Sequence, residues 1–191
     1  MNKEDFKKIW LKSELDSWTE FPFEEIEKSN LNNETIEFLK NGFPESAAPF
    51  LGFGLDSYDG KLYNIFDYYD DDELDIKPKN YWVFGSDGAG NPVCFDSSEN
   101  DKIVLLDHEQ GFEIIQTMNK NIFELASSLL LYREFINNVN SELGEDAYFD
   151  GKFTEKSLKE LEIKFEKLNP HYYVESSFWD SEIENLRAEI E

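Results

Sequence analysis

The stretch YWVFGSDGAGNPVCFDSSENDKIVLLDHEQGFEIIQT, residues 81–117, decides the fold. Within it, short runs of aromatic and β-branched residues alternate with clusters of Gly, Asp, Asn and Ser, which is typical of an antiparallel meander. Asp87-Gly88-Ala89-Gly90 offers two glycines for a tight hairpin, and Asp107–Gly111 is predicted to form the next turn. With the residues upstream, the pattern predicts strands at about 50–54, 61–66, 80–86, 91–96, 102–107 and 112–117.

Helical periodicity is found on both sides of this region. Asn32 and Asn121 are predicted N-caps, the second in a capping box with Glu124, and Asp180 is the expected cap of the last helix. The predicted helices cover 4–15, 32–40, a long segment from 121 onwards, 154–168 and 180–190. We therefore expect an α+β fold, with an antiparallel sheet of about five or six strands flanked by N-terminal and C-terminal helices.

The length of 191 residues suits one domain, and 17 Phe, 9 Tyr and 4 Trp are enough for a substantial core. No linker or internal repeat is visible, so we expect a single domain over 1–191, with N-terminal helices in 1–41, the sheet in 42–118 and C-terminal helices in 119–191. The charged N-terminus and the absence of a long apolar run predict a cytoplasmic protein with no membrane association.

The chain is strongly acidic, because 42 Asp and Glu stand against 18 Lys and Arg and give a formal charge of −24. This charge argues against binding of nucleic acid or of an anionic membrane, and it favours a basic protein partner. Half of this net negative charge lies in residues 42–118. The densest part is a run of carboxylates preceded by two tyrosines: Tyr68, Tyr69, Asp70, Asp71, Asp72, Glu73 and Asp75.

Two interpretations of this run stay open. It can be a solvated loop that protects a sheet edge, or a partner-binding patch that steers association. We take the second as the working hypothesis, with Asp87, Glu99 and Asp101 as a second cluster. The run lacks the Gly and Glu positions of an EF-hand, so no metal is expected there.

Few residues suggest catalysis. A single cysteine, Cys94, excludes an internal disulfide, and with two histidines it cannot form a closed Cys/His zinc site. His108 and His171 lie in predicted turns, Cys94 lies in a predicted strand, and no phosphate-binding loop or nucleophile elbow occurs. With 42 carboxylates, a hydrolytic pair arises from composition alone and carries little information. We therefore expect no enzymatic activity and no cofactor.

The segment Phe38-Leu39-Lys40-Asn41-Gly42-Phe43-Pro44-Glu45 resembles the helix followed by "GLP" in the SUKH superfamily, with Phe43 in place of the usual Leu. Residues 81–96 are similar to the central hairpin of that family, and Ser177-Phe178-Trp179 fits a subgroup with an extended C-terminus. The residues that carry the resemblance have architectural roles in turns and core: Gly42, Pro44, Trp82, Gly85 and Gly90.

This resemblance implies a non-enzymatic bacterial immunity protein, which neutralises a polymorphic toxin, often a nuclease, by binding it directly. The fungal Smi/Knr relatives imply an alternative, a regulatory adaptor or scaffold with a partner other than a toxin. The family has no shared catalytic residues to transfer, and its toxin-binding surface varies. The predicted partner-binding residues therefore come from the charge argument, and the oligomeric state is left open.

Overall fold

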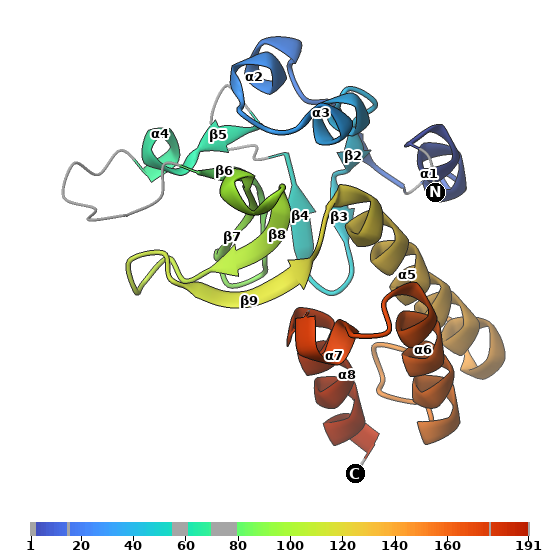
Figure 1. Ribbon diagram of the computed structural model, residues 1–191. Coiled ribbons are helices and arrows are strands. Elements are labelled where there is room, and N and C mark those ends of the chain that lie inside the picture. Colours follow the sequence, from blue (N-terminus) through green and yellow to red (C-terminus); the bar gives the residue numbers. More distant parts are fainter. Residues whose placement is uncertain (1–2, 15, 55–60, 70–79, 176, 191) are drawn as a thin grey trace. The chain divides into compact units, whose positions relative to one another are not determined.

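The computed structural model describes residues 3–14, 16–54, 61–69, 80–175 and 177–190 (Figure 1). The chain divides into two compact units, Met1–Leu125 and Ala126–Glu191, with the boundary inside a long helix. The fold is α+β as predicted, with a mainly antiparallel sheet and helices towards both termini. No sequence feature indicated the boundary between the units, and the single domain over 1–191 stays a prediction.

Seven strands of the first unit form one sheet in the order β3-β4-β6-β7-β8-β9, with β5 paired to β6. Every pairing is antiparallel. The strands are β3 (Ser46–Ala47), β4 (Leu51–Phe53), β5 (Tyr63–Asn64), β6 (Tyr81–Ser86), β7 (Pro92–Asp96), β8 (Lys102–Leu106) and β9 (Ile114–Asn119). The strand predicted over 61–66 is wrong from Ile65 onwards, because α4 (Ile65–Tyr69) begins there.

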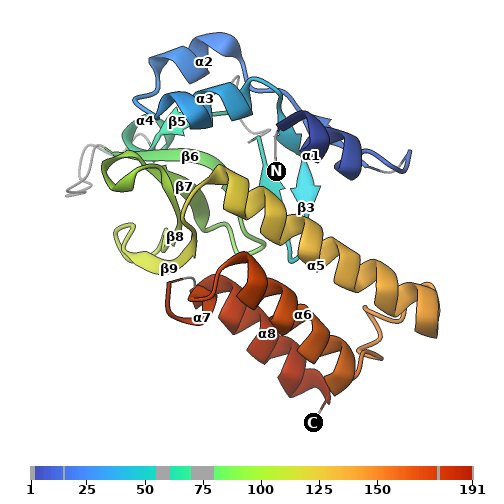
Figure 2. The ribbon, with the colours of Figure 1, turned by 45° about the vertical axis from the view of Figure 1, so that its right-hand side comes forward.

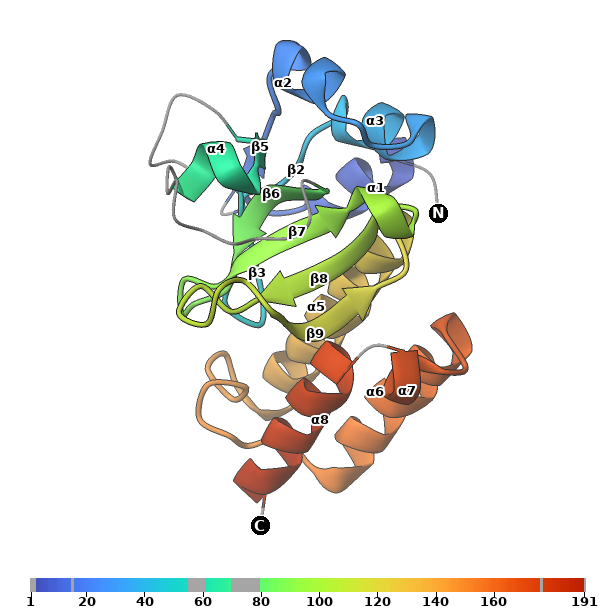
Figure 3. The same cartoon turned by 60° about the vertical axis from the view of Figure 1, so that its left-hand side comes forward.

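Three turns of this sheet lie at the same end (Figure 3). Gly52 pairs with Ser86 and Val93 with Leu105, so the β3–β4, β6–β7 and β8–β9 turns follow one another along that end. The β7–β8 connection, which contains the short 3-10 helix η1 (Ser97–Glu99), lies at the opposite end.

The N-terminal elements of this unit are α1 (Lys3–Trp10), β1 (Trp18–Thr19), α2 (Phe23–Lys28), α3 (Asn33–Leu39) and β2 (Phe43–Pro44). Asn32 is the N-cap of α3 as predicted, since its side chain accepts from the Thr35 amide at 2.9 Å. Gly42 has φ +79°, and a Cβ there would lie 2.4 Å from the carbonyl oxygen of Thr19. Only glycine therefore fits where β1 pairs with β2.

A run of aromatic rings forms the core of the first unit. Phe84 stacks on Phe95 with centroids 4.1 Å apart, and on Phe53 at 5.3 Å. Phe43 meets Phe53 edge to face at 4.8 Å and contacts Phe6 at 5.4 Å. All five rings are at most 2% exposed, so α1, β2 and the sheet share one continuous core.

The second unit is helical and contains the larger part of α5 (Ile122–Leu143), α6 (Glu155–Leu168), α7 (Tyr172–Glu175) and α8 (Ser177–Ile190). Figure 2 shows α6 and α8 side by side, and Trp179 lies between Tyr132 and Phe165 in their core. Asn121 caps α5 as predicted, by accepting from the Glu124 amide at 3.0 Å. The predicted Asp180 cap is wrong, because α8 already begins at Ser177.

Candidate partner-binding surface

The carboxylate run predicted from the sequence, Asp70, Asp71, Asp72, Glu73 and Asp75, lies outside the described residues. Tyr68 and Tyr69 end helix α4, but their side chains also fall outside the described part of the chain. The structure therefore neither supports nor contradicts the hypothesis that this run binds a partner.

The second predicted cluster is wrong, because its three members do not lie together. Asp87 is in the β6–β7 turn, whereas Glu99 and Asp101 are in the β7–β8 connection at the other end of β7. A five-residue strand separates the two sites by roughly 17 Å.

Asp101 is also not a surface residue. It is 1% exposed and accepts a 2.8 Å hydrogen bond from the backbone amide of Asn32. Its carboxylate thus attaches the connection before α3 to the sheet, and it cannot contact a partner directly. Glu99 is exposed, but it does not form a cluster with Asp87.

The residue that does belong to a charged surface is Asp87. We define the turn surface as the three turns at one end of the sheet, residues 48–50, 87–91 and 107–113. It carries four carboxylates and no Lys or Arg: Asp87, Asp107, Glu109 and Glu113. Among the described residues of the sheet region, the lysines are Lys61, which donates to Thr19 Oγ1 at 2.6 Å, and Lys102, at the far end of β8.

Asp87 fixes the conformation of its own turn. Its Oδ1 accepts hydrogen bonds from the backbone amides of Ala89 at 2.9 Å and Asn91 at 2.8 Å. Its Oδ2 accepts a third, from Asn91 Nδ2 at 3.0 Å. This is the side-chain-to-backbone pattern that makes Asp a favoured turn residue. Asp107 acts in the same way in the next turn, accepting from the Glu109 amide at 2.8 Å.

A side-chain contact joins these two turns. His108 Nδ1 lies 2.8 Å from Asn91 Oδ1, so Asp87, Asn91 and His108 form a chain of hydrogen bonds across the β6–β7 and β8–β9 turns. When Asn91 Oδ1 is the acceptor, His108 carries its proton on Nδ1. These hydrogen bonds hold together the two turns that carry the carboxylates of the turn surface.

An aromatic side chain stands beside these carboxylates. Phe50, in the β3–β4 turn, is 81% exposed, which is the largest value among the described large hydrophobic residues. A Cβ added to Gly88 would lie only 3.1 Å from the Phe50 Cβ, so the two turns are in close contact. The turn surface thus combines negative charge with one protruding ring, a composition suited to protein recognition.

The residues considered for catalysis do not form a reactive site. Cys94 is fully buried, and this burial, with the nearby Asp96 carboxylate, raises the pKa of its thiol well above the usual value. A thiol in such surroundings is a poor nucleophile. His108 and His171 are exposed, as expected for turn residues. Within the described ranges, no group of three His, Cys, Asp or Glu side chains is arranged to hold a metal ion.

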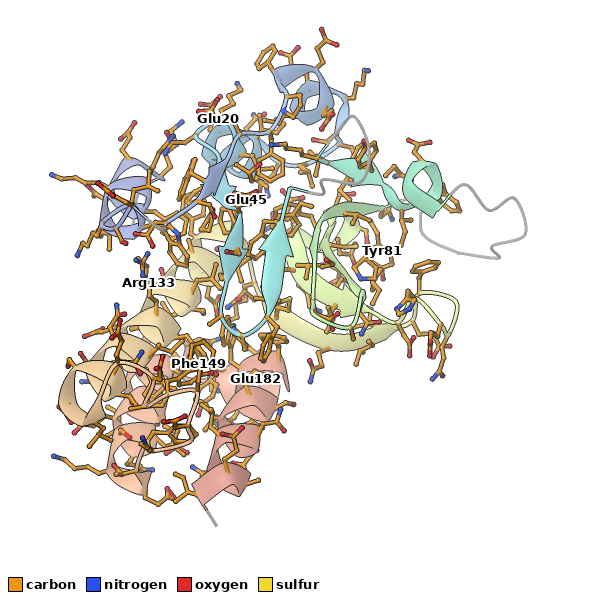
Figure 4. The ribbon with its side chains drawn as sticks, turned by 180° about the vertical axis from the view of Figure 1, so that it is seen from behind. Glu20, Glu45, Tyr81, Arg133, Phe149 and Glu182 are labelled. Atoms are coloured by element: carbon orange, nitrogen blue, oxygen red, sulfur yellow. The ribbon has the colours of Figure 1, made fainter. Side chains whose placement is uncertain are left out.

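Two tyrosines have raised pKa values because they are packed in cores. Tyr81, labelled in Figure 4, begins β6 and is opposite Asp96; burial and that carboxylate raise the pKa of Tyr81 to about 12. In the second unit, burial raises the pKa of Tyr132, whose hydroxyl lies 3.0 Å from that of Tyr148. Both rings belong to packed cores, so neither shift indicates catalysis.

Most of the turn surface is not predicted by the sequence patterns described above. Glu109, Glu113 and Phe50 are not among the predicted partner-binding residues, because Glu109 is one acidic residue of the predicted 107–111 turn, whereas Phe50 and Glu113 fall in the strands predicted over 50–54 and 112–117. The strand assignments contained a usable signal, since consecutive hairpins in a meander place alternate turns at the same end of the sheet. The two predicted turns contain Asp87, Asp107 and Glu109 and no Lys or Arg, which indicates an acidic end of the sheet, whereas Glu113 and Phe50 carry no such signal.

No protein-family model matches the chain, and comparisons with curated proteins and with solved structures find no significant match. The SUKH resemblance therefore stays a prediction. In the parts of the chain that the structure describes, no helix has both the length and the apolar character needed to cross a membrane.

Proposed function

We propose that this protein is an immunity protein, which binds a basic toxin domain through the turn surface and thereby neutralises it. The observation that carries the proposal is the gathering of four carboxylates and no cation in three adjoining turns. A surface of one charge sign raises the rate of encounter with an oppositely charged partner. The SUKH resemblance supports a toxin as that partner.

The proposed mechanism is occupation of the toxin's own binding groove. A nuclease toxin needs Lys and Arg side chains to hold phosphates. Glu109 and Glu113 are exposed and can present carboxylates to such a groove in place of phosphates. Asp87 and Asp107 are half-buried and already accept hydrogen bonds, so they chiefly shape the turns that present the other two.

The test uses the product of the neighbouring reading frame as the candidate toxin. We expect its purified C-terminal domain to bind this protein, and the complex to weaken as salt rises. The double variant Glu109→Lys/Glu113→Lys should lower the association rate at low salt by about tenfold or more. Association is followed by stopped-flow fluorescence at two salt concentrations.

A matched control changes the formal charge by the same amount elsewhere. Glu142 and Glu145 are exposed and belong to the helical unit, so Glu142→Lys/Glu145→Lys should have little effect on the rate. An equal loss in both double variants would mean that only net charge matters, and the turn surface would then be the wrong site. A neighbouring product that fails to bind the unmodified protein would refute the proposed function.

A further inference from the structure

Phe50 has a backbone conformation that its residue type disfavours. Its φ is +52°, in the left-handed region that side chains with a Cβ rarely adopt, apart from Asn and Asp. Its ring is 81% exposed, so it gains little from packing within the chain. In this turn Asn would fit the backbone better and would expose less apolar surface.

Phe112 is a second phenylalanine with a left-handed backbone, and its ring is buried. It lies in the β8–β9 turn with φ +59°, but it is only 5% exposed and packs in a core cluster with Val104 and Leu106. For Phe112, burial of the ring offsets the backbone cost. Phe50 has the same backbone conformation without that burial, so the reason for an aromatic ring there must lie outside the folded chain.

We propose that Phe50 is the anchor of the partner interface, and that it enters an apolar pocket bordered by Lys or Arg on the basic partner. This inference rests on the proposed function and adds the feature that the partner must possess. Exposed aromatic residues ringed by polar groups are the usual centres of protein interfaces. The β6–β7 turn, which adjoins Phe50, and the β8–β9 turn beyond it supply polar groups on one side of the ring, with carboxylates on both 87–91 and 107–113.

Gly88 leaves room for the side chain of Phe50. Because a Cβ at Gly88 would lie 3.1 Å from the Phe50 Cβ, any larger residue would crowd the base of the Phe50 side chain from the β6–β7 turn. The glycine therefore allows the aromatic side chain and the acidic turn to stand next to each other, which suits a partner that contacts both together.

The experiment compares Phe50→Asn with Phe149→Asn for folding and for binding to the purified neighbouring toxin domain. Phe149 is a matched control, because it is 77% exposed but lies in the helical unit (Figure 4) and has no left-handed backbone. Phe50→Asn should raise the melting temperature by about 2–4 °C and weaken binding by at least roughly 30-fold. Phe149→Asn should leave binding unchanged and should not raise the melting temperature.

Each outcome decides the matter. If Phe50→Asn binds the toxin domain as tightly as the unmodified protein, the inference is wrong and the proposed function stands. If it lowers the melting temperature substantially, Phe50 serves the fold and the inference is also wrong. If sedimentation shows that the substitution dissolves a dimer of the free protein, a second copy covers the ring instead. Failure of the unmodified protein to bind would refute the proposed function and this inference together.

Discussion

The shape of the β6–β7 turn depends on hydrogen bonds to the carboxylate of Asp87, and the substitution Asp87→Ala tests that dependence. Replacing it with Ala removes the acceptor of two backbone amides and of the Asn91 side chain. Hydrogen bonds to a charged group contribute about 1.5–3 kcal/mol each when buried, but these donors can turn to water in a half-exposed loop. Loss of a comparable capping residue costs about 0.5–2 kcal/mol, so we expect Asp87→Ala to lose about 1–2 kcal/mol.

The assay is urea denaturation together with amide hydrogen exchange. Asp87→Ala should speed exchange at the amides of Ala89 and Asn91, whose acceptor it removes. Asp87→Asn is the control, because its side-chain oxygen can still accept from both amides, and it should lose less than about 1 kcal/mol. If Asp87→Ala unfolds at the same urea concentration with unchanged exchange, the turn does not depend on this carboxylate and the reasoning fails.

Two further substitutions test a backbone contact in the first unit and a buried carboxyl group in the second. In the first unit, a Cβ at Gly85 would lie 2.4 Å from the carbonyl oxygen of Gly52. Gly85→Ala should therefore force β4 away from β6 and lower the free energy of unfolding in urea by about 3 kcal/mol. A loss below about 0.5 kcal/mol would contradict this close approach. In the second, burial raises the pKa of Glu182 despite a hydrogen bond from Asn185 that lowers it. Because the folded pKa lies above the unfolded one, the protonated form is favoured by folding, and this stabilisation is lost as pH rises through the folded pKa. The Glu182→Gln variant should therefore be more stable than the unmodified protein at pH 7, by less than about 1 kcal/mol because Glu182 is partly solvated. The difference should vanish near pH 4. A variant that is less stable at pH 7 would contradict a raised pKa of Glu182.

The sequence predicted the central meander because each strand there is bounded by unambiguous turn residues. β6, β7 and β8 occupy nearly the predicted ranges, and Asn32 and Asn121 cap their helices as expected. The two-residue strands β1, β2 and β3 were not predicted, because so few residues show no alternation, whereas β5 lies within the strand predicted over 61–66.

Other features depend on tertiary contacts that no local pattern records. Asp101 was expected at the surface as an ordinary acidic residue, but its partner is an amide 69 positions earlier in the chain. Ile65 and Phe66 are strand formers by propensity, yet they belong to α4. The left-handed backbone of Phe50 carries no sequence signal at all, since Gly or Asn is what such a position predicts.

The most direct test of the central claim is hydrogen exchange of the protein with and without the bound toxin domain. The turn surface should be protected in the complex, with slower exchange of amides in 48–50, 87–91 and 107–113 and little change in 155–190. Protection confined to 70–79 or to the helical unit, with the three turns unchanged, would contradict the claim that the partner binds this end of the sheet.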